Sequence, residues 1–174
     1  QFLVLRADTA PDGQPLTMKK MNELLADKFA KTKKGKILLN TDWYKNEDFF
    51  VRETSKLGWA LVSKENIPNS TSKNYLQQTQ EMIKYLTGEV FKDEDTPPEY
   101  LEAIAEFESY YAGHFQGKTD EEIKSLLASN IQKYAQELGD LKINQLTRQA
   151  PADTLYDILM YFGQNSRILE NKYT

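Results

Sequence analysis

Residues 40–86 read NTDWYKNEDFF (40–50), VRETSKLGWALVSKE (51–65) and NIPNSTSKNYLQQTQEMIKYL (66–86). Both tryptophans of the chain, Trp43 and Trp59, lie in this stretch, and Tyr44 follows the first of them directly. Large aromatic side chains bury more apolar area per residue than other types. We therefore expect this stretch to lie in or against the core, with the rest of the chain arranged around it.

Short segments of the first 65 residues have patterns typical of extended backbone. Residues 2–6 form an apolar run that fits either a buried strand or the end of a longer element. Residues 37–39, 48–51 and 59–63 are further strand candidates. In the last of these, Trp59 and Leu61 share one face if the backbone is extended. The sequence thus predicts a small sheet or a few extended segments in the N-terminal third.

Amphipathic helices are predicted for most of the remaining chain. Thr17 is placed to cap the first of them, while Thr96 and Thr119 each stand three residues before a glutamate, as in a capping box. Gly88 stands where a glycine would end a helix. Apolar residues recur at spacings of three and four. The expected helices cover residues 17–31, 73–87, 97–112, 120–138, 140–146 and 151–163.

These elements predict a mainly α fold, a bundle of about five to six helices with a few short strands or extended segments in the N-terminal third. At 174 residues a single domain is expected. In this domain the mixed region 1–66 packs on a helical bundle formed by residues 67–174. The chain could also be the N-terminal part of a longer protein.

Composition disfavours several classes of function. The chain has no cysteine, which excludes disulfides, thiolate catalysis and sulfur-ligated zinc. Its net charge of −4 argues against nucleic acid as the main partner. No apolar run approaches the ~20 residues that a membrane span needs. The cytoplasm is slightly favoured as the compartment, and export after removal of a signal peptide is the alternative.

A small basic cluster covers residues 31–36, with Lys33 and Lys34 at its centre. One hypothesis is that it contacts nucleic acid or another anion. A solvated helix C-terminus is the favoured interpretation, because lysines there interact well with the helix dipole and the rest of the chain is acidic.

No catalytic, metal or cofactor motif is present. His114 is the only histidine, and the acidic run 93–95 lacks the spacing of a calcium loop. Glu102 and Glu106 lie one helical turn apart, but a solvent-facing helix surface explains them more simply. The chain has no glycine-rich phosphate loop, no Gly-x-Ser-x-Gly and no His-Glu-x-x-His. We therefore expect no cofactor and no metal, and catalytic residues are unknown.

Several segments resemble a family of uncharacterised proteins from candidate-phylum bacteria. They are WYKNEDFF (43–50), GWALVSKE (58–65), LKINQLTRQ (141–149) and the ending LENKYT (169–174). The resemblance covers most of the chain and transfers no site residue, because no activity is established for that family. It implies that the chain continues into a glycine-rich, β-rich segment.

The leading functional hypothesis is a non-catalytic binding or scaffold module that contacts another protein and supports a following domain. Trp43, Tyr44 and Trp59 are the candidate binding residues, and in the alternative that follows one of them would be exposed as a platform for a sugar. The main alternative is a carboxylate-based hydrolase of glycan or peptidoglycan, with two acidic residues flanking a cleft and an exposed aromatic platform. A weaker alternative is nucleic-acid contact through Lys33 and Lys34.

Overall fold

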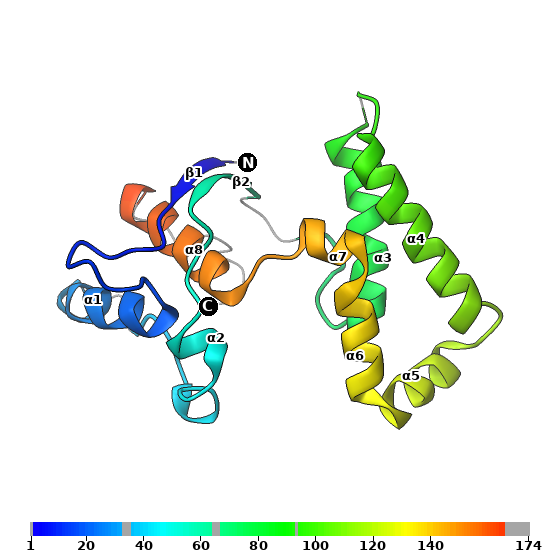
Figure 1. Ribbon diagram of the computed structural model, residues 1–174, viewed down its shortest axis with the longest axis horizontal. Helices are drawn as coiled ribbons and strands as arrows, with labels where there is room; N and C mark the ends of the chain where they lie inside the picture. The colour runs from blue at the N-terminus through cyan, green and yellow to red at the C-terminus, as the bar shows by residue number, and fades with distance from the viewer. Residues whose placement is uncertain (1, 33–35, 64–66, 93, 166–174) are drawn as a thin grey trace. The chain divides into compact units, whose positions relative to one another are not determined.

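The computed structural model describes residues 2–32, 36–63, 67–92 and 94–165, and these ranges are mainly helical with one two-stranded antiparallel sheet (Figure 1). The predicted fold class is therefore confirmed. The chain divides into two compact units, and each is treated by itself below. Unit 1 is Gln1–Glu65 with Gln149–Thr174, and unit 2 is Asn66–Arg148. The single domain stays a prediction.

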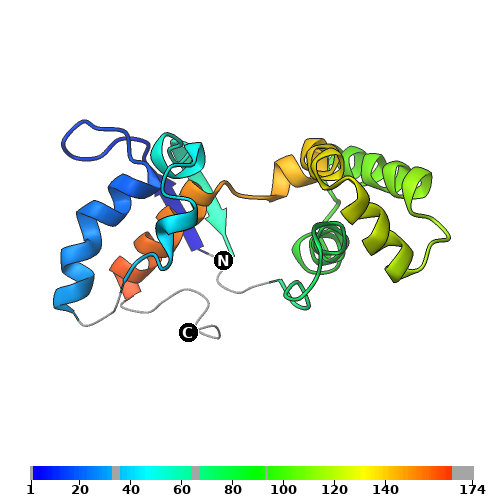
Figure 2. The ribbon, with the colours of Figure 1, turned by 90° about the horizontal axis from the view of Figure 1, so that it is seen from below.

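Unit 1 combines the sheet with the first and last helices of the chain. Its elements are β1 (Phe2–Arg6), α1 (Met18–Lys31), the 3-10 turn η1 (Thr41–Trp43), α2 (Asp48–Val51), β2 (Gly58–Val62) and α8 (Pro151–Asn165). The two strands pair antiparallel in a register that runs from Phe2 opposite Val62 to Arg6 opposite Gly58. Helix α8 packs against β1, α1 and α2, and Figure 2 shows it (orange) between the strands and α1.

Three sequence-based expectations change in unit 1. Helix α8 belongs with the N-terminal elements and not with the helices of residues 67–147. The segment 48–51 is a helical turn, because the Glu47 carbonyl accepts from the amides of Phe50 and Val51. Residues 37–39 form no strand, and Asn40, at a φ of 50°, turns the chain directly after them.

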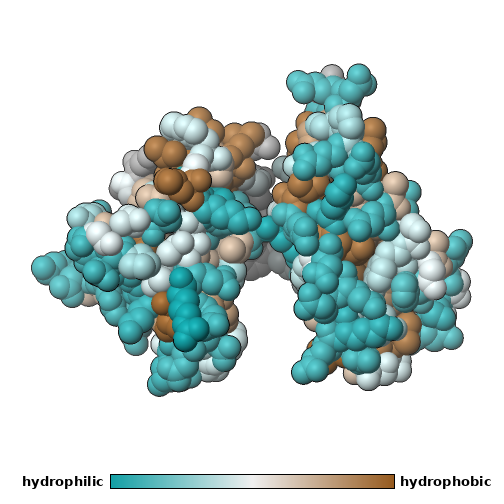
Figure 3. Space-filling view, viewed as in Figure 1, coloured by the Kyte–Doolittle hydropathy of each residue, from teal (hydrophilic) through white to brown (hydrophobic). Residues whose placement is uncertain are grey.

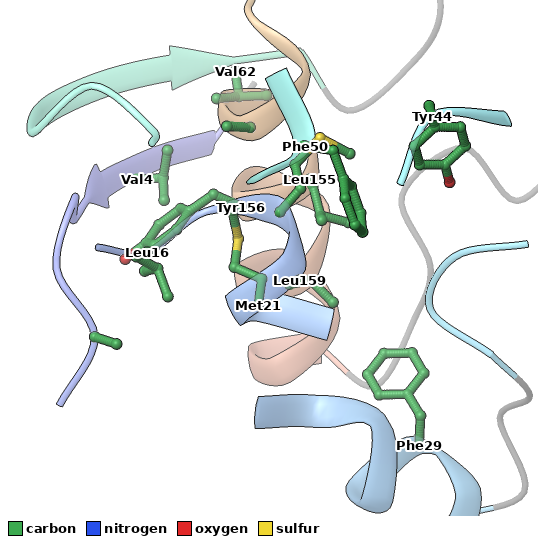
Figure 4. Close-up of a cluster of buried hydrophobic side chains, with 13 residues drawn as sticks. Val4, Leu16, Met21, Phe29, Tyr44, Phe50, Val62, Leu155, Tyr156 and Leu159 are labelled. Carbon is green, nitrogen blue, oxygen red and sulfur yellow. The ribbon is translucent and has the colours of Figure 1, made fainter. Parts of the chain in front are cut away.

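The core of unit 1 lies on the α8 side of the sheet. Val4 and Val62 are buried there with Leu155, Tyr156 and other apolar residues of α1, α2 and α8 (Figure 4). Such a two-layer packing covers the apolar stripe of a helix with one face of a sheet. The inner face of the sheet is therefore fully used by the fold.

A buried ionic cluster joins the two ends of unit 1. Arg6 donates from Nε and Nη2 to the two carboxylate oxygens of Asp157, at 2.9 and 2.6 Å. Its Nη1 lies 3.4 Å from Asp153, which also accepts from the backbone amide of Lys56 at 2.8 Å. The hydrogen bond to Asp157 raises the pKa of Arg6 against the opposing effect of burial. The arginine therefore stays charged among two buried carboxylates.

Replacing Arg6 by methionine is expected to lower the free energy of unfolding by ~3–5 kcal/mol, because two buried carboxylates lose their counter-charge. Arg52→Met is the matched control, since Arg52 pairs with Asp48 at an exposed site and should cost less than ~1 kcal/mol. Urea denaturation followed by circular dichroism measures both. Equal effects of the two substitutions would contradict the assigned role of Arg6.

Unit 2 is all helical. Its elements are α3 (Tyr75–Tyr85), the π-helical turn η2 (Leu86–Val90), α4 (Pro98–His114), α5 (Asp120–Ser129), α6 (Ile131–Asp140) and α7 (Lys142–Thr147). Helix α7 packs against α3, α4 and α6, and α5 packs against α6. The core includes the fully buried Phe115, Leu76 and Ile143.

The helix starts and ends predicted for unit 2 are only partly confirmed. Thr119 forms the predicted capping box with Glu122. Thr96 does not cap α4, because the N-cap position is taken by Pro97, which makes no side-chain cap. The helix expected over 120–138 is broken at Asn130, whose side chain caps α6. Gly88 does not stop α3, since the chain continues through it as a π-helical turn.

A buried polar network connects α3 to α7. The Thr79 hydroxyl lies 2.9 Å from Asn144 Oδ1, and Asn144 Nδ2 donates to the Leu138 carbonyl at 2.7 Å. Arg148 donates to Asn144 Oδ1 at 2.9 Å, and its guanidinium stacks on the Tyr75 ring at 3.7 Å. Burial lowers the pKa of Arg148. The network satisfies polar groups that would otherwise be costly inside the core.

Thr79→Val is expected to lower the free energy of unfolding by ~1–3 kcal/mol, because it removes a buried hydroxyl that bridges two helices. Thr87→Val is the control, since Thr87 also bonds to a carbonyl one turn earlier but is exposed. Urea denaturation of the two variants gives the comparison. A loss no larger for Thr79 than for Thr87 would show that the network adds nothing to stability.

Candidate functional site

The outer face of the β1–β2 sheet carries four large apolar side chains, Leu3, Leu5, Trp59 and Leu61, which we call the outer sheet face. They are exposed by 61%, 51%, 69% and 63% of their surface. The strand register places Leu3 opposite Leu61 and Leu5 opposite Trp59. Side chains along a strand alternate between the two faces. Figure 3 shows apolar residues gathered over the sheet.

Hydrogen bonds from α8 and from the segment just before β2 hold the sheet in place. Tyr156 of α8 donates its hydroxyl to the Leu5 carbonyl at 3.1 Å. Just before β2, buried Ser55 donates to the Ala7 carbonyl. Together with the Arg6–Asp157 pair, these bonds fix the two strands at the Arg6–Gly58 end of the paired segment. The outer sheet face is therefore a supported surface.

Trp43 is a second exposed aromatic residue of unit 1, and it lies in η1. Its side chain is 76% exposed, and its ring meets the Tyr44 ring edge-on at a centroid distance of 4.6 Å. Tyr44 is only 8% exposed and packs against Phe49 and Phe50. Tyr44 thus supports Trp43 from the core and has little surface of its own in contact with solvent.

The aromatic stretch lies against the core through Tyr44 and Phe50, whereas both of its tryptophans are exposed. Trp59 stands at an outward position of a strand whose inward positions are taken by smaller side chains, and Trp43 projects from a short turn. Of the predicted binding residues, the structure leaves Trp43 and Trp59 accessible and buries Tyr44. Lys33 and Lys34 lie outside the described residues.

Two pairs of described carboxylates, each pair one helical turn apart, are engaged in structural bonds. Asp153 and Asp157, one turn apart on α8, are buried around Arg6 and out of reach of a substrate. Glu102 and Glu106 both contact Lys142, the first at its ammonium and the second at its backbone amide, each at 2.9 Å. Sequence reasoning considered the glutamates and overlooked the two aspartates.

Where a described carboxylate has a shifted pKa, the shift is downward. The hydrogen bond from Lys20 lowers the pKa of Asp12, and those from Lys73 and Lys84 lower the pKa of Glu81. The Thr119 amide and hydroxyl lower the pKa of Glu122. A general acid needs the opposite shift, as burial in an apolar pocket produces.

His114 and Tyr110 form another pair of titratable side chains in close contact. The His114 ring stacks on Tyr110 at a centroid distance of 4.4 Å, and its Nδ1 lies 2.9 Å from the Tyr110 carbonyl. The Tyr110 hydroxyl donates to Glu137 at 2.9 Å, and burial together with this bond raises the pKa of Tyr110. Among the described residues, no group of three or more histidines and acids could hold a metal ion.

Leu3, Leu5 and Leu61 were not recognised as candidate site residues from the sequence. The signal was partly present, since residues 2–5 form an apolar run and Trp59 and Leu61 alternate with smaller residues. What was missing is the pairing of two strands more than fifty residues apart, which decides the face that meets solvent.

Comparison with protein-family models gives no match, and the searches of curated proteins and of solved structures give none either. The functional assignment therefore rests on the residues of this chain. Within the described ranges, no helix has the length and apolar character needed to cross a membrane.

Both tryptophans are expected to be open to solvent in dilute solution. In the variants Trp43→Phe and Trp59→Phe, iodide should quench the remaining tryptophan almost as strongly in the folded chain as in the urea-unfolded chain, since each ring is more than two-thirds exposed. Strong protection of either tryptophan in the folded, dilute protein would contradict its placement.

Proposed function

We propose that this chain is a protein-binding module and that the outer sheet face is its contact surface. The observation that supports this most directly is the exposure of Leu3, Leu5, Trp59 and Leu61 on one supported face. An antiparallel sheet with one face in water normally presents polar side chains there. Monomeric proteins rarely expose apolar patches beyond a few hundred Å², and larger ones mark interaction sites.

The composition of the face fits protein recognition. Tryptophan is enriched among the residues that contribute most to binding energy, particularly near the centre of an interface. The bonds from Tyr156 and Arg6 hold the strands, so little conformational freedom is lost when a partner binds. A rigid apolar face of this kind binds without needing catalytic groups.

A glycan hydrolase is the second candidate. Exposed Trp43 and Trp59 offer the flat rings that such enzymes use to stack on sugars. The carboxylate pair that the reaction needs has less support. Every shifted pKa among the described carboxylates is lowered, and Asp153 and Asp157 are buried. Nucleic-acid contact through Lys33 and Lys34 has the least support, given the net charge of −4.

Selection of a displayed random-peptide library on the purified protein tests the binding function. We expect enriched peptides whose affinity falls at least about tenfold on Leu61→Glu, because a charge in the centre of an apolar interface loses its solvation. Leu39→Glu is the matched control, since Leu39 is 68% exposed and lies outside the sheet.

Peptides that bind the wild type and both variants equally would place the binding surface elsewhere. A failure to enrich any peptide that depends on Leu61 would remove the proposal. Circular dichroism of the two variants confirms that each retains its helical content.

A further inference from the structure

We propose that a second copy of this chain docks on the outer sheet face, so that two sheets stack about a two-fold axis. This inference rests on the proposed protein-binding function and names the partner of the same face. Three observations support it: the face carries no charge, it presents a large apolar area, and no second layer from the described residues covers it, although the inner face is covered by α8.

The outer sheet face is chemically self-complementary. Its four side chains carry no charge, and the only polar group among them is the indole N–H of Trp59. In a two-fold interface each patch meets its own copy, so a patch with net charge would repel itself. An apolar patch has no such conflict, whereas a charged partner would have to bury its charges unpaired.

The charged residues that flank the strands in sequence are of both signs. Asp8 follows β1, and Glu53 and Lys56 precede β2. Binding to an anionic lipid surface would favour a dominant basic rim beside the apolar residues. The residues next to the strands supply no dominant basic charge, so a protein partner is favoured over an anionic membrane.

The extent of the face fits a small dimer interface. A tryptophan alone buries ~150–250 Å², so with three leucines beside Trp59 the face presents a few hundred Å². A standard interface takes ~800 Å² from each partner. The outer sheet face is large enough to form the apolar centre of such an interface, and homodimer interfaces are more apolar than other transient ones.

The sheet has one covered face and one open face. Val4 and Val62 on the inner face are buried against α8, whereas Leu3 and Leu61 on the outer face are exposed. Two packed layers around a hydrophobic core are the usual solution for an apolar sheet face. A second sheet stacked ~10 Å away supplies that layer, with the leucines of the two copies between the sheets.

Sedimentation velocity of the full chain over a dilution series tests the dimer. The wild type is expected to shift from the 20.1 kDa monomer to twice that mass as its concentration rises. Leu61→Glu should raise the dissociation constant at least about tenfold, because two copies of the carboxylate enter one apolar interface. Leu39→Glu should behave as the wild type.

Leu61→Ser is a second, uncharged variant, used in case the glutamate disturbs folding, and it should weaken the dimer in the same direction. Iodide quenching gives an independent readout, since Trp59 should become protected with rising concentration while Trp43 stays accessible.

A wild type that stays monomeric throughout the series would overturn the dimer. A dimer unaffected by Leu61→Glu and Leu61→Ser would overturn it too, because another surface would then join the copies. If peptides selected on the wild type still depend on Leu61 while the chain is monomeric, the binding function stands without the dimer. If neither result depends on Leu61, both proposals fail.

Discussion

The buried pair between Arg6 and Asp157 is the interaction on which unit 1 depends. It joins the first strand to the last helix across 151 positions of sequence. Asp153, on the same helix, accepts a hydrogen bond from the Lys56 amide and so holds the segment just before β2. Burying three charges costs desolvation free energy, so such a cluster contributes more to the specificity of the packing than to the net free energy of folding. A different packing of α8 would leave these charges without partners.

This constraint also decides which side of the sheet meets solvent. Arg6 points inward, and alternation along the strand then places Val4 inward and Leu3 and Leu5 outward. A slip of one residue would reverse every side chain and bury the leucines in place of the arginine. The exposed apolar face is therefore a direct consequence of the buried ionic cluster, and the proposed binding function follows from where one arginine must lie.

Helical structure could be predicted from the sequence where the signal is local. Thr17 and Thr119 bond to amides three residues away, so the sequence pattern contains both partners of the interaction. The pairing of β1 with β2 and the contact of Arg6 with Asp157 join residues that no local pattern connects. The exposure of Trp59 depends on that pairing, which is why the rule that large aromatic side chains are buried does not decide its position. Tyr44 obeyed the same rule, because its ring packs on Phe50 within the same short segment.

One ionic cluster holds the sheet by its inner face and leaves the outer face exposed, where we propose that a partner binds. Hydroxyl-radical footprinting at low and high protein concentration tests it most directly. We expect heavy labelling of Leu3, Trp59 and Leu61 in dilute protein and protection of the same residues in concentrated protein. Buried Val4 and Val62 should stay unlabelled at either concentration. Labelling of the two valines, or equal labelling of the outer residues at both concentrations, would contradict it.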